Sequence, residues 1–219
     1  NLTNLFSDSI TSNWSYGRYW HGWMVVIRPL LVFFDYSEIR YLNIIFMTLL
    51  LIIFLGMVYK YIGINAELAF ILGFLLVNFW IVPLCLHYSS VFYLALIFGI
   101  ILILLRNKPH IFGLCFFTVG SLTCFFDLLS APMVTLGVCL VLAYMLISNN
   151  HHTFLSEAKI MFNYCVLWFL GYSLTWATKI MLLLTLNNKT VFTEAISQII
   201  LRSGSNSGKV MSLSQRFLN

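Results

Sequence analysis

The sequence predicts an all-α membrane protein, a polytopic transmembrane helical bundle with about six spans and with extracytoplasmic juxtamembrane amphipathic helices. Two compositional values support this fold class. Of the 219 residues, 61% are hydrophobic and 9% are charged, whereas soluble domains carry about 25% charged residues. The mean hydropathy is +0.93. The apolar runs are also long and continuous, which favours spanning helices over the alternating strands of a β-barrel.

Each predicted span is an apolar run close to the roughly 20 residues that cross the hydrocarbon core as a helix. Pro83 interrupts the second run near its end, and the turns after the second and fourth runs are short enough to form helical hairpins. The predicted spans are 42–58, 68–86, 91–105, a run from 111 into "FFDLLSAP", 133–147 and 160–186.

The distribution of Lys and Arg predicts the orientation of these spans. Alternate connections carry Lys60, then Arg106 with Lys108, then Lys159, whereas the intervening connections "HYSS" and "LLSAP" carry no Lys or Arg. Basic short loops face the cytoplasm in most membrane proteins. With six spans, both the N-terminal segment and the C-terminal tail are therefore expected to be extracytoplasmic.

The stretch "RYWHGWMVVIRPLL" precedes the first span and is too charged to be a span itself. Its aromatic and aliphatic residues recur near helical spacing, which predicts a short interfacial helix kinked at Pro29. One interpretation is an anchor, with Trp20 and Trp23 seated at the headgroup level. The other is that Arg18, His21 and Arg28 line an outer cleft and bind a phosphate, since positions 21 and 28 are two helical turns apart.

Two charged residues fall inside the predicted spans. Asp127 lies near the outer end of the fourth span and Lys179 in the outer half of the sixth. A charge in a span usually faces the bundle interior or a wet cavity. The two residues are predicted either to form an ion pair that holds the helices together or to line an outward-facing polar cavity. Gly120 lies on about the same helix face as Asp127, and Gly171 on that of Lys179, and these small residues would allow helices to approach closely.

Asp35 and Glu38 follow the interfacial helix at a spacing of one helical turn. Paired carboxylates of this kind can act as a general base and as a metal ligand, or they can be solvated residues that pair with Arg40. No HExxH, GxSxG, P-loop or GxGxxG motif is present. The five cysteines lie in apolar runs without ligand spacing, which favours buried packing residues over a metal site or a disulfide framework.

The predicted organisation has three parts. Residues 1–40 form an extracytoplasmic loop with the interfacial helix, 41–187 form the six-span bundle, and 188–219 form an extracytoplasmic amphipathic helix, ending near Arg202, with a flexible tail. The polar beginning and end of the chain indicate a piece of a longer protein. The net charge of +5 comes from scattered basic residues, so nucleic acid is not an expected partner.

This layout resembles the GT-C superfamily of polytopic glycosyltransferases, which includes oligosaccharyl and mannosyl transferases. In that family a long first outer loop carries a juxtamembrane helix, to which "RYWHGWMVVIRPLL" would correspond. The segments "FFDLLSAPMVTLG" and "GYSLTWATK" also resemble uncharacterised bacterial multi-pass membrane proteins. The family's acidic catalytic residue lies early in the first outer loop, where Asp8 is the one acidic residue present; otherwise the catalytic residue precedes Asn1.

The resemblance implies an integral membrane glycosyltransferase that takes a sugar from a polyprenyl-phosphate-linked donor at the extracytoplasmic face. Its partners would be membrane lipid and the polyprenyl-phosphate-linked substrate, and the cofactor is unknown, a divalent metal being one option. Alternatives are a transporter or flippase of lipid-linked substrates and a non-catalytic membrane subunit. The expected catalytic candidates are Asp8, Asp35 and Glu38, and the substrate-binding candidates are Arg18, His21, Arg28, Asp127, Lys179 and Arg202.

Overall fold

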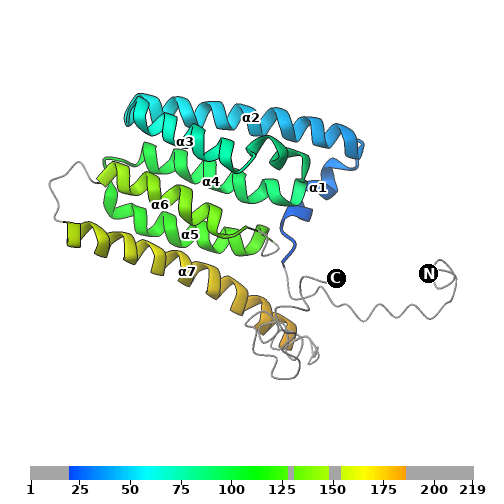
Figure 1. The fold of residues 1–219 in the computed structure, drawn as a ribbon. Coiled ribbons are helices and arrows are strands. Elements are labelled where there is room, and N and C mark those ends of the chain that lie inside the picture. Colours follow the sequence, from blue (N-terminus) through cyan, green and yellow to red (C-terminus); the bar gives the residue numbers. More distant parts are fainter. Residues whose placement is uncertain (1–19, 128–130, 148–153, 186–219) are drawn as a thin grey trace, which may run out of the picture. The chain divides into compact units, whose positions relative to one another are not determined.

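The computed structural model describes residues 20–127, 131–147 and 154–185, and these residues form helices and connecting turns without a β-strand (Figure 1). Two compact units are distinguished: Trp20–Ala177, and a second unit of Asn1–Tyr19 with Thr178–Asn219. Because the described residues form helices and no strand, the all-α fold class is confirmed. The elements are α1 (Trp23–Leu30), α2 (Tyr36–Tyr61), α3 (Ile64–Leu76), η2 (Phe79–Leu84), α4 (Leu86–Leu104), η3 (Pro109–Ile111), α5 (Phe112–Phe126), α6 (Met133–Ile147) and α7 (Phe154–Thr185).

Four of the described helical segments are long and apolar enough to cross a membrane. They are Tyr36–Tyr61, Leu86–Leu104, Pro109–Phe126 and Phe154–Leu182, which correspond to the first, third, fourth and sixth predicted spans. The apolar helices α3 and α6 are shorter, with 13 and 15 residues. The chain is thus an integral membrane protein.

The first span begins earlier than its apolar run does. α2 starts at Tyr36, six residues before the predicted start at 42, because Asp35 and Glu38 form a capping box at its N-terminus. The Asp35 backbone N–H donates to Glu38 Oε2 at 2.9 Å. After α2 the chain reverses at Gly63, whose φ of 128° is a conformation that glycine adopts without strain.

The second predicted span is not one continuous helix. α3 ends at Leu76, Asn78 adopts a left-handed conformation (φ 52°), and the chain continues as the 3₁₀-helix η2, which contains Pro83. A helix of 13 residues covers only about 20 Å, so α3 alone is short of the hydrocarbon thickness. The sequence showed the proline but not the break before it, because the run 68–77 is uniformly apolar.

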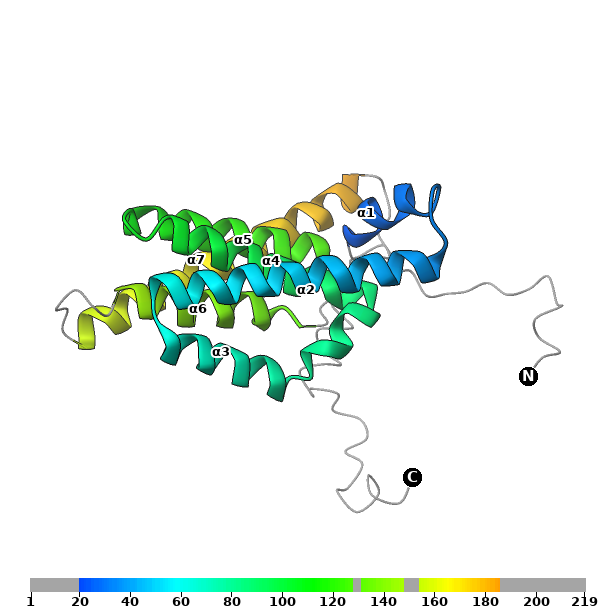
Figure 2. The same ribbon diagram turned by 90° about the horizontal axis from the view of Figure 1, so that it is seen from above.

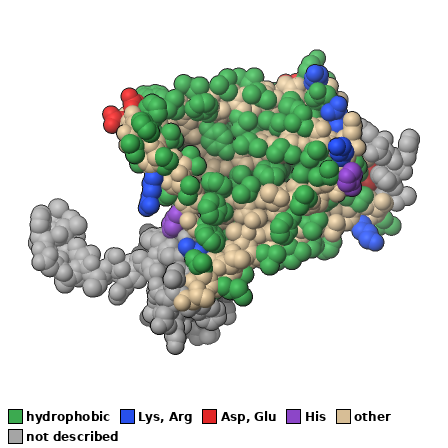
Figure 3. Space-filling view, turned by 180° about the vertical axis from the view of Figure 1, so that it is seen from behind, with side chains coloured by type: hydrophobic (Ala, Val, Ile, Leu, Met, Phe, Trp, Pro, Cys, Tyr) green, Lys and Arg blue, Asp and Glu red, His purple; other side chains and the backbone are tan. Residues whose placement is uncertain are grey.

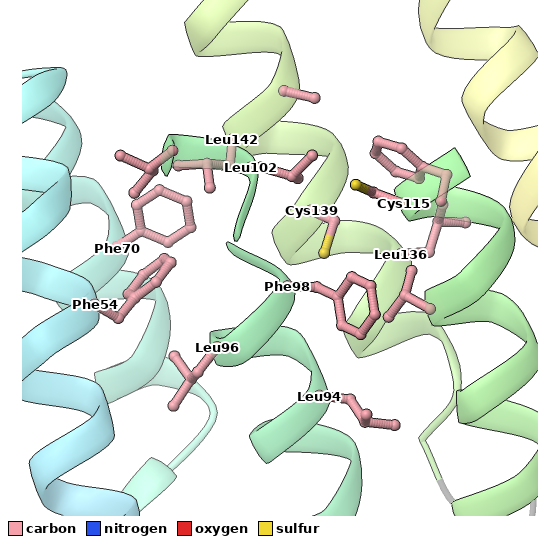
Figure 4. Close-up of a cluster of buried hydrophobic side chains, with 14 of the residues drawn as sticks. Phe54, Phe70, Leu94, Leu96, Phe98, Leu102, Cys115, Leu136, Cys139 and Leu142 are labelled. Atoms are coloured by element: carbon pink, nitrogen blue, oxygen red, sulfur yellow. The ribbon is translucent and has the colours of Figure 1, made fainter. Parts of the chain in front are cut away.

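α4 is central among the helices of the unit Trp20–Ala177 (Figures 1 and 2). It packs against α2, α5 and α6, and its buried residues occur all round its circumference. Phe54 of α2 packs directly on Gly99, where an added Cβ would lie 2.6 Å from the ring. Around this contact, side chains from α2 to α6 form the core shown in Figure 4, in which Cys115 and Cys139 are free cysteines packed among Leu and Phe side chains.

Successive long helices run antiparallel, so the helix termini and the turns that connect them lie at two opposite ends of the bundle (Figure 2). One end contains the turn between α2 and α3, the turn between α4 and α5, and the start of α7. We call it the basic end because of the exposed Lys, Arg and His side chains of these segments, which gather along one edge in Figure 3; the opposite edge carries a few basic, His and acidic side chains as well. Its exposed basic residues are Lys60, Arg106, Lys108, His110 and Lys159.

Candidate functional site

The helix α1 lies at the end of the bundle opposite the basic end and packs on the first turns of α2 and α4 (Figures 1 and 2). Ile27 is buried against Ile39 and Leu86, with Trp23 and Leu30 packed beside them. The start of α1 is fixed by a hydrogen bond from the Gly22 N–H to the Phe125 carbonyl at 3.0 Å. A Cβ at position 22 would overlap Phe125, so only glycine fits this contact.

An open, mostly apolar groove of about 620 Å³ lies between α1, α2 and α4. This volume falls within the range of ligand sites in proteins, about 300–1,000 Å³. α1 supplies one wall, and its groove-facing side chains are aliphatic or aromatic. The lining residues are Trp23, Val26, Ile27, Leu30, Ile39, Leu42, Asn43, Phe46, Leu50, Leu86, Ser89, Ser90, Tyr93, Leu94, Ile97 and Phe126.

A polar cluster of Asn43, Ser89 and Tyr93 forms part of the groove wall. Asn43 Nδ2 donates to the Pro83 carbonyl and to Ser89 Oγ, both at 2.7 Å, and Tyr93 donates to Asn43 Oδ1 at 3.0 Å. Ser89 donates to the Val82 and Cys85 carbonyls at 3.1 Å. The cluster therefore gives the Pro83 carbonyl of η2 a side-chain partner and adds a second donor to the Val82 and Cys85 carbonyls, which already accept backbone N–H groups. Internal partners of this kind are what membrane-embedded backbone requires.

These three residues were not among the site residues predicted from the sequence. Asn43 stands at the start of a long apolar run, and "HYSSVFY" places two serines and a tyrosine in another, which is the signal that could have pointed to it. Both N–H groups of the Asn43 amide are used inside the protein. The groove interior is thus suited to a neutral hydrocarbon chain and offers no spare amide donor to an anion.

The predicted row of cations is only partly in the described residues. Arg18 lies outside them. His21 has a φ of 53° and precedes α1, so the expected two-turn helical spacing between His21 and Arg28 is wrong. Arg28 lies in the last turn of α1 and is exposed, on the helix that forms the groove wall but not among the lining side chains.

The two tryptophans differ in their surroundings. The Trp20 indole N–H donates to the Thr175 carbonyl at 3.0 Å, and its ring lies 5.6 Å from that of Phe125. Trp20 therefore ties the segment before α1 to α7. Trp23 lines the groove, and its buried indole nitrogen has no hydrogen-bond partner among the described residues.

The candidate carboxylates fall in different environments. Asp35 and Glu38 cap α2 as described above, and both side chains are exposed, so their carboxylates have a structural role there. Asp8 and Arg202 lie outside the described residues. Within those residues there is no group of three or more His, Cys, Asp or Glu side chains that could hold a metal ion.

Asp127 and Lys179 are both on or next to helices, as expected. Asp127 is the C-cap residue of α5, its side chain is 2% exposed, and its backbone N–H donates to the Thr123 carbonyl at 2.8 Å. Lys179 lies in α7, in the part of that helix that belongs to the second unit. Their pairing stays a prediction.

The expected close approach of helices at Gly120 and Gly171 is confirmed. A Cβ at position 120 would overlap the Trp168 carbonyl of α7, and a Cβ at position 171 would overlap the Phe117 carbonyl of α5. Beside this crossing, Ser121 and Thr175 share a hydrogen bond of 2.7 Å. The two helix backbones are therefore in direct contact, the geometry that small residues permit in membranes.

Comparisons of the chain with protein-family models, with curated proteins and with solved structures find no match.

Proposed function

We propose that the groove between α1, α2 and α4 holds the hydrocarbon chain of a lipid-linked substrate. On this proposal, the chain is the membrane part of a GT-C-like glycosyltransferase that uses a polyprenyl-phosphate-linked sugar donor at the extracytoplasmic face. The observation that supports the proposal is the groove itself, about 620 Å³ of largely apolar space bounded by a helix that precedes the first span.

The phosphate of such a donor would lie at the mouth of the groove, because the amide and hydroxyl groups of Asn43, Ser89 and Tyr93 inside it already bond one another. Arg28 is the exposed cation on the wall-forming helix, and its planar guanidinium is suited to bidentate contact with phosphate oxygens. Arg18 and His21 would add to this contact. Among the candidate carboxylates, Asp8 would activate the acceptor.

The proposal includes six membrane crossings with the basic end in the cytoplasm. α3 and η2 together would cover about 30 Å if collinear, enough for one interrupted crossing. α6, with 15 residues, would cross at a thinner or locally thinned part of the bilayer. The N-terminal segment and the tail would then both be extracytoplasmic, on the side of the groove.

The test is binding of a photoreactive short-chain polyprenyl phosphate to the purified protein. Ile97 lines the groove and is 41% exposed, so Ile97→Trp should fill the groove without disturbing the core. We expect this variant to weaken binding by about tenfold or more, since the hydrocarbon chain loses apolar area on the wall. The matched control is Val141→Trp, at a 47% exposed position on a different apolar groove, which should bind normally.

A second pair of variants examines the phosphate contact. Arg28→Ala should weaken binding by about tenfold, and Arg28→Lys should restore only part of it, because an ammonium lacks the bidentate fork. Equal binding by Ile97→Trp and the wild type would exclude the groove. Binding without sugar transfer to any acceptor by the full-length protein would favour the flippase or the non-catalytic subunit.

A further inference from the structure

Another groove, of about 610 Å³ and distinct from the two apolar grooves above, opens at the basic end between α5 and α7. We infer that it binds the phosphate headgroup and upper acyl chain of an anionic glycerophospholipid from the surrounding membrane. This inference requires only that the protein is inserted in a bilayer, and it is independent of the proposed transferase activity. The lining residues are Pro109, His110, Gly113, Ile147, Lys159, Ile160, Asn163, Tyr164 and Leu167.

The groove exists because α5 and α7 diverge from their glycine crossing. At Gly120 and Gly171 an added Cβ would meet the backbone of the opposite helix. Two turns closer to the basic end, a Cβ at Gly113 would meet only the Leu167 side-chain end, at 3.0 Å. The helices are therefore further apart at Gly113, and the space between them remains open where the two helices start.

The polar and apolar residues of the groove are separated by depth. His110 and Lys159 lie near the first turns of their helices and are exposed, and Asn163 follows one turn further along α7. Leu167 lies eight positions after Lys159, about 12 Å deeper along the helix. A polar entrance above an apolar floor matches an amphiphile with its headgroup at the membrane surface.

The charge at this end determines which headgroup fits. Lys159 and His110 line the groove, and Lys108 is next to it in the chain. Two acidic residues of the described chain lie at the same end: Glu67, in the first turn of α3, and Glu157, which is buried in the first turn of α7. The exposed side chains that line the entrance are thus cationic or neutral. Basic pockets between membrane helices are suited to anionic headgroups.

The experiment titrates the detergent-purified protein with dioleoyl phosphatidylglycerol or dioleoyl phosphatidylcholine and follows binding by native mass spectrometry. The two lipids share their acyl chains and differ in headgroup charge. We expect the anionic lipid to bind at least about tenfold more tightly, because its phosphate makes charge-assisted contacts with the basic side chains. Phosphatidylcholine also has a phosphate, but its own quaternary ammonium neutralises that charge. Lys159→Gln combined with His110→Gln should remove this preference.

The matched control is Lys60→Gln, which removes an exposed cation from the same end but outside the groove. Retained preference in Lys60→Gln supports a localised site, and an equal loss in both variants overturns it in favour of a diffuse surface potential. Gly113→Leu should weaken both lipids, because its side chain fills the apolar floor. Competition by soluble glycerophosphoglycerol at the same concentration as the lipid would also overturn the proposal, since the floor would then contribute nothing.

Discussion

The helices of this protein are held together in two different ways. A continuous series of aromatic rings joins four of the elements, α2, α3, η2 and α4. Neighbouring rings in the series have centroids 5.1–6.3 Å apart, and its members are Phe54, Phe70, Phe74, Phe79 and Phe92. We call these helices the aromatic half. α5, α6 and α7, which we call the small-residue half, meet where Gly120 and Gly171 bring two backbones into contact and through shared hydroxyl groups. Nearer the basic end, α5 and α7 also share one stacked ring pair, Phe116 with Tyr164.

The difference shows where a membrane bundle can leave room for ligands. Large rings keep helices apart, and both apolar grooves, of about 620 and 340 Å³, border the aromatic half. Glycine lets backbones touch, which excludes a groove at the crossing and allows one only where the helices diverge. The two halves should therefore respond to opposite kinds of substitution, the first to loss of volume and the second to its gain.

The largest effect is expected in the small-residue half. Gly120→Leu should cost more than about 5 kcal/mol in the free energy of unfolding, among the rare severe cases, because the backbones of α5 and α7 must separate. Unfolding in mixed micelles measures it. The control is Gly137→Leu, at a position with no atom within 4 Å of the added Cβ, which should change stability by less than about 0.5 kcal/mol. Equal stability of the two variants would contradict the direct backbone contact.

The next effect concerns loss of volume in the aromatic half. Phe54→Ala should cost about 3–5 kcal/mol, because Phe54 is fully buried between Gly99, Phe70 and Phe74 and would leave a cavity. The same unfolding assay applies. Phe162→Ala, at a position that is 70% exposed on α7, is the matched control and should be nearly neutral. A small cost at Phe54 would show that the aromatic half can collapse around the missing ring.

The smallest effect is expected for the hydroxyl contacts. Thr135 Oγ1 lies 2.9 Å from Thr123 Oγ1 and accepts the Trp168 indole N–H at 3.2 Å. Thr135→Val should cost about 1–2 kcal/mol, since interhelical hydrogen bonds in membranes average about 0.6 kcal/mol. Thr118→Val, which removes only a bond to Leu114 of the same helix, is the comparison. A double-mutant cycle that combines Thr135→Val with Trp168→Phe isolates the interaction energy between these two side chains. A coupling energy of zero would argue against the hydrogen bond from the Trp168 indole to Thr135.

The candidate site was predictable only in outline. The spacing of aromatic and aliphatic residues indicated a helix before the first span, and α1 is that helix. The expected helical spacing between His21 and Arg28 is wrong, because His21 adopts a left-handed conformation before α1 and Gly22 is bound to Phe125, more than 100 positions away in the chain. Asp35 and Glu38 had the spacing of a catalytic pair, which is also the spacing of a capping box.

By itself the sequence determined that this protein is helical and membrane-embedded, roughly where its apolar helices lie, and which connections are basic. These properties follow from residues acting locally, because transfer to lipid and helix formation add up along a single segment. The tertiary structure decided the break at Asn78, the polar support of η2 by Asn43 and Ser89, and the two ends at which grooves open. These depend on which side chains of distant segments meet, and a glycine's effect is set by the helix that packs against it.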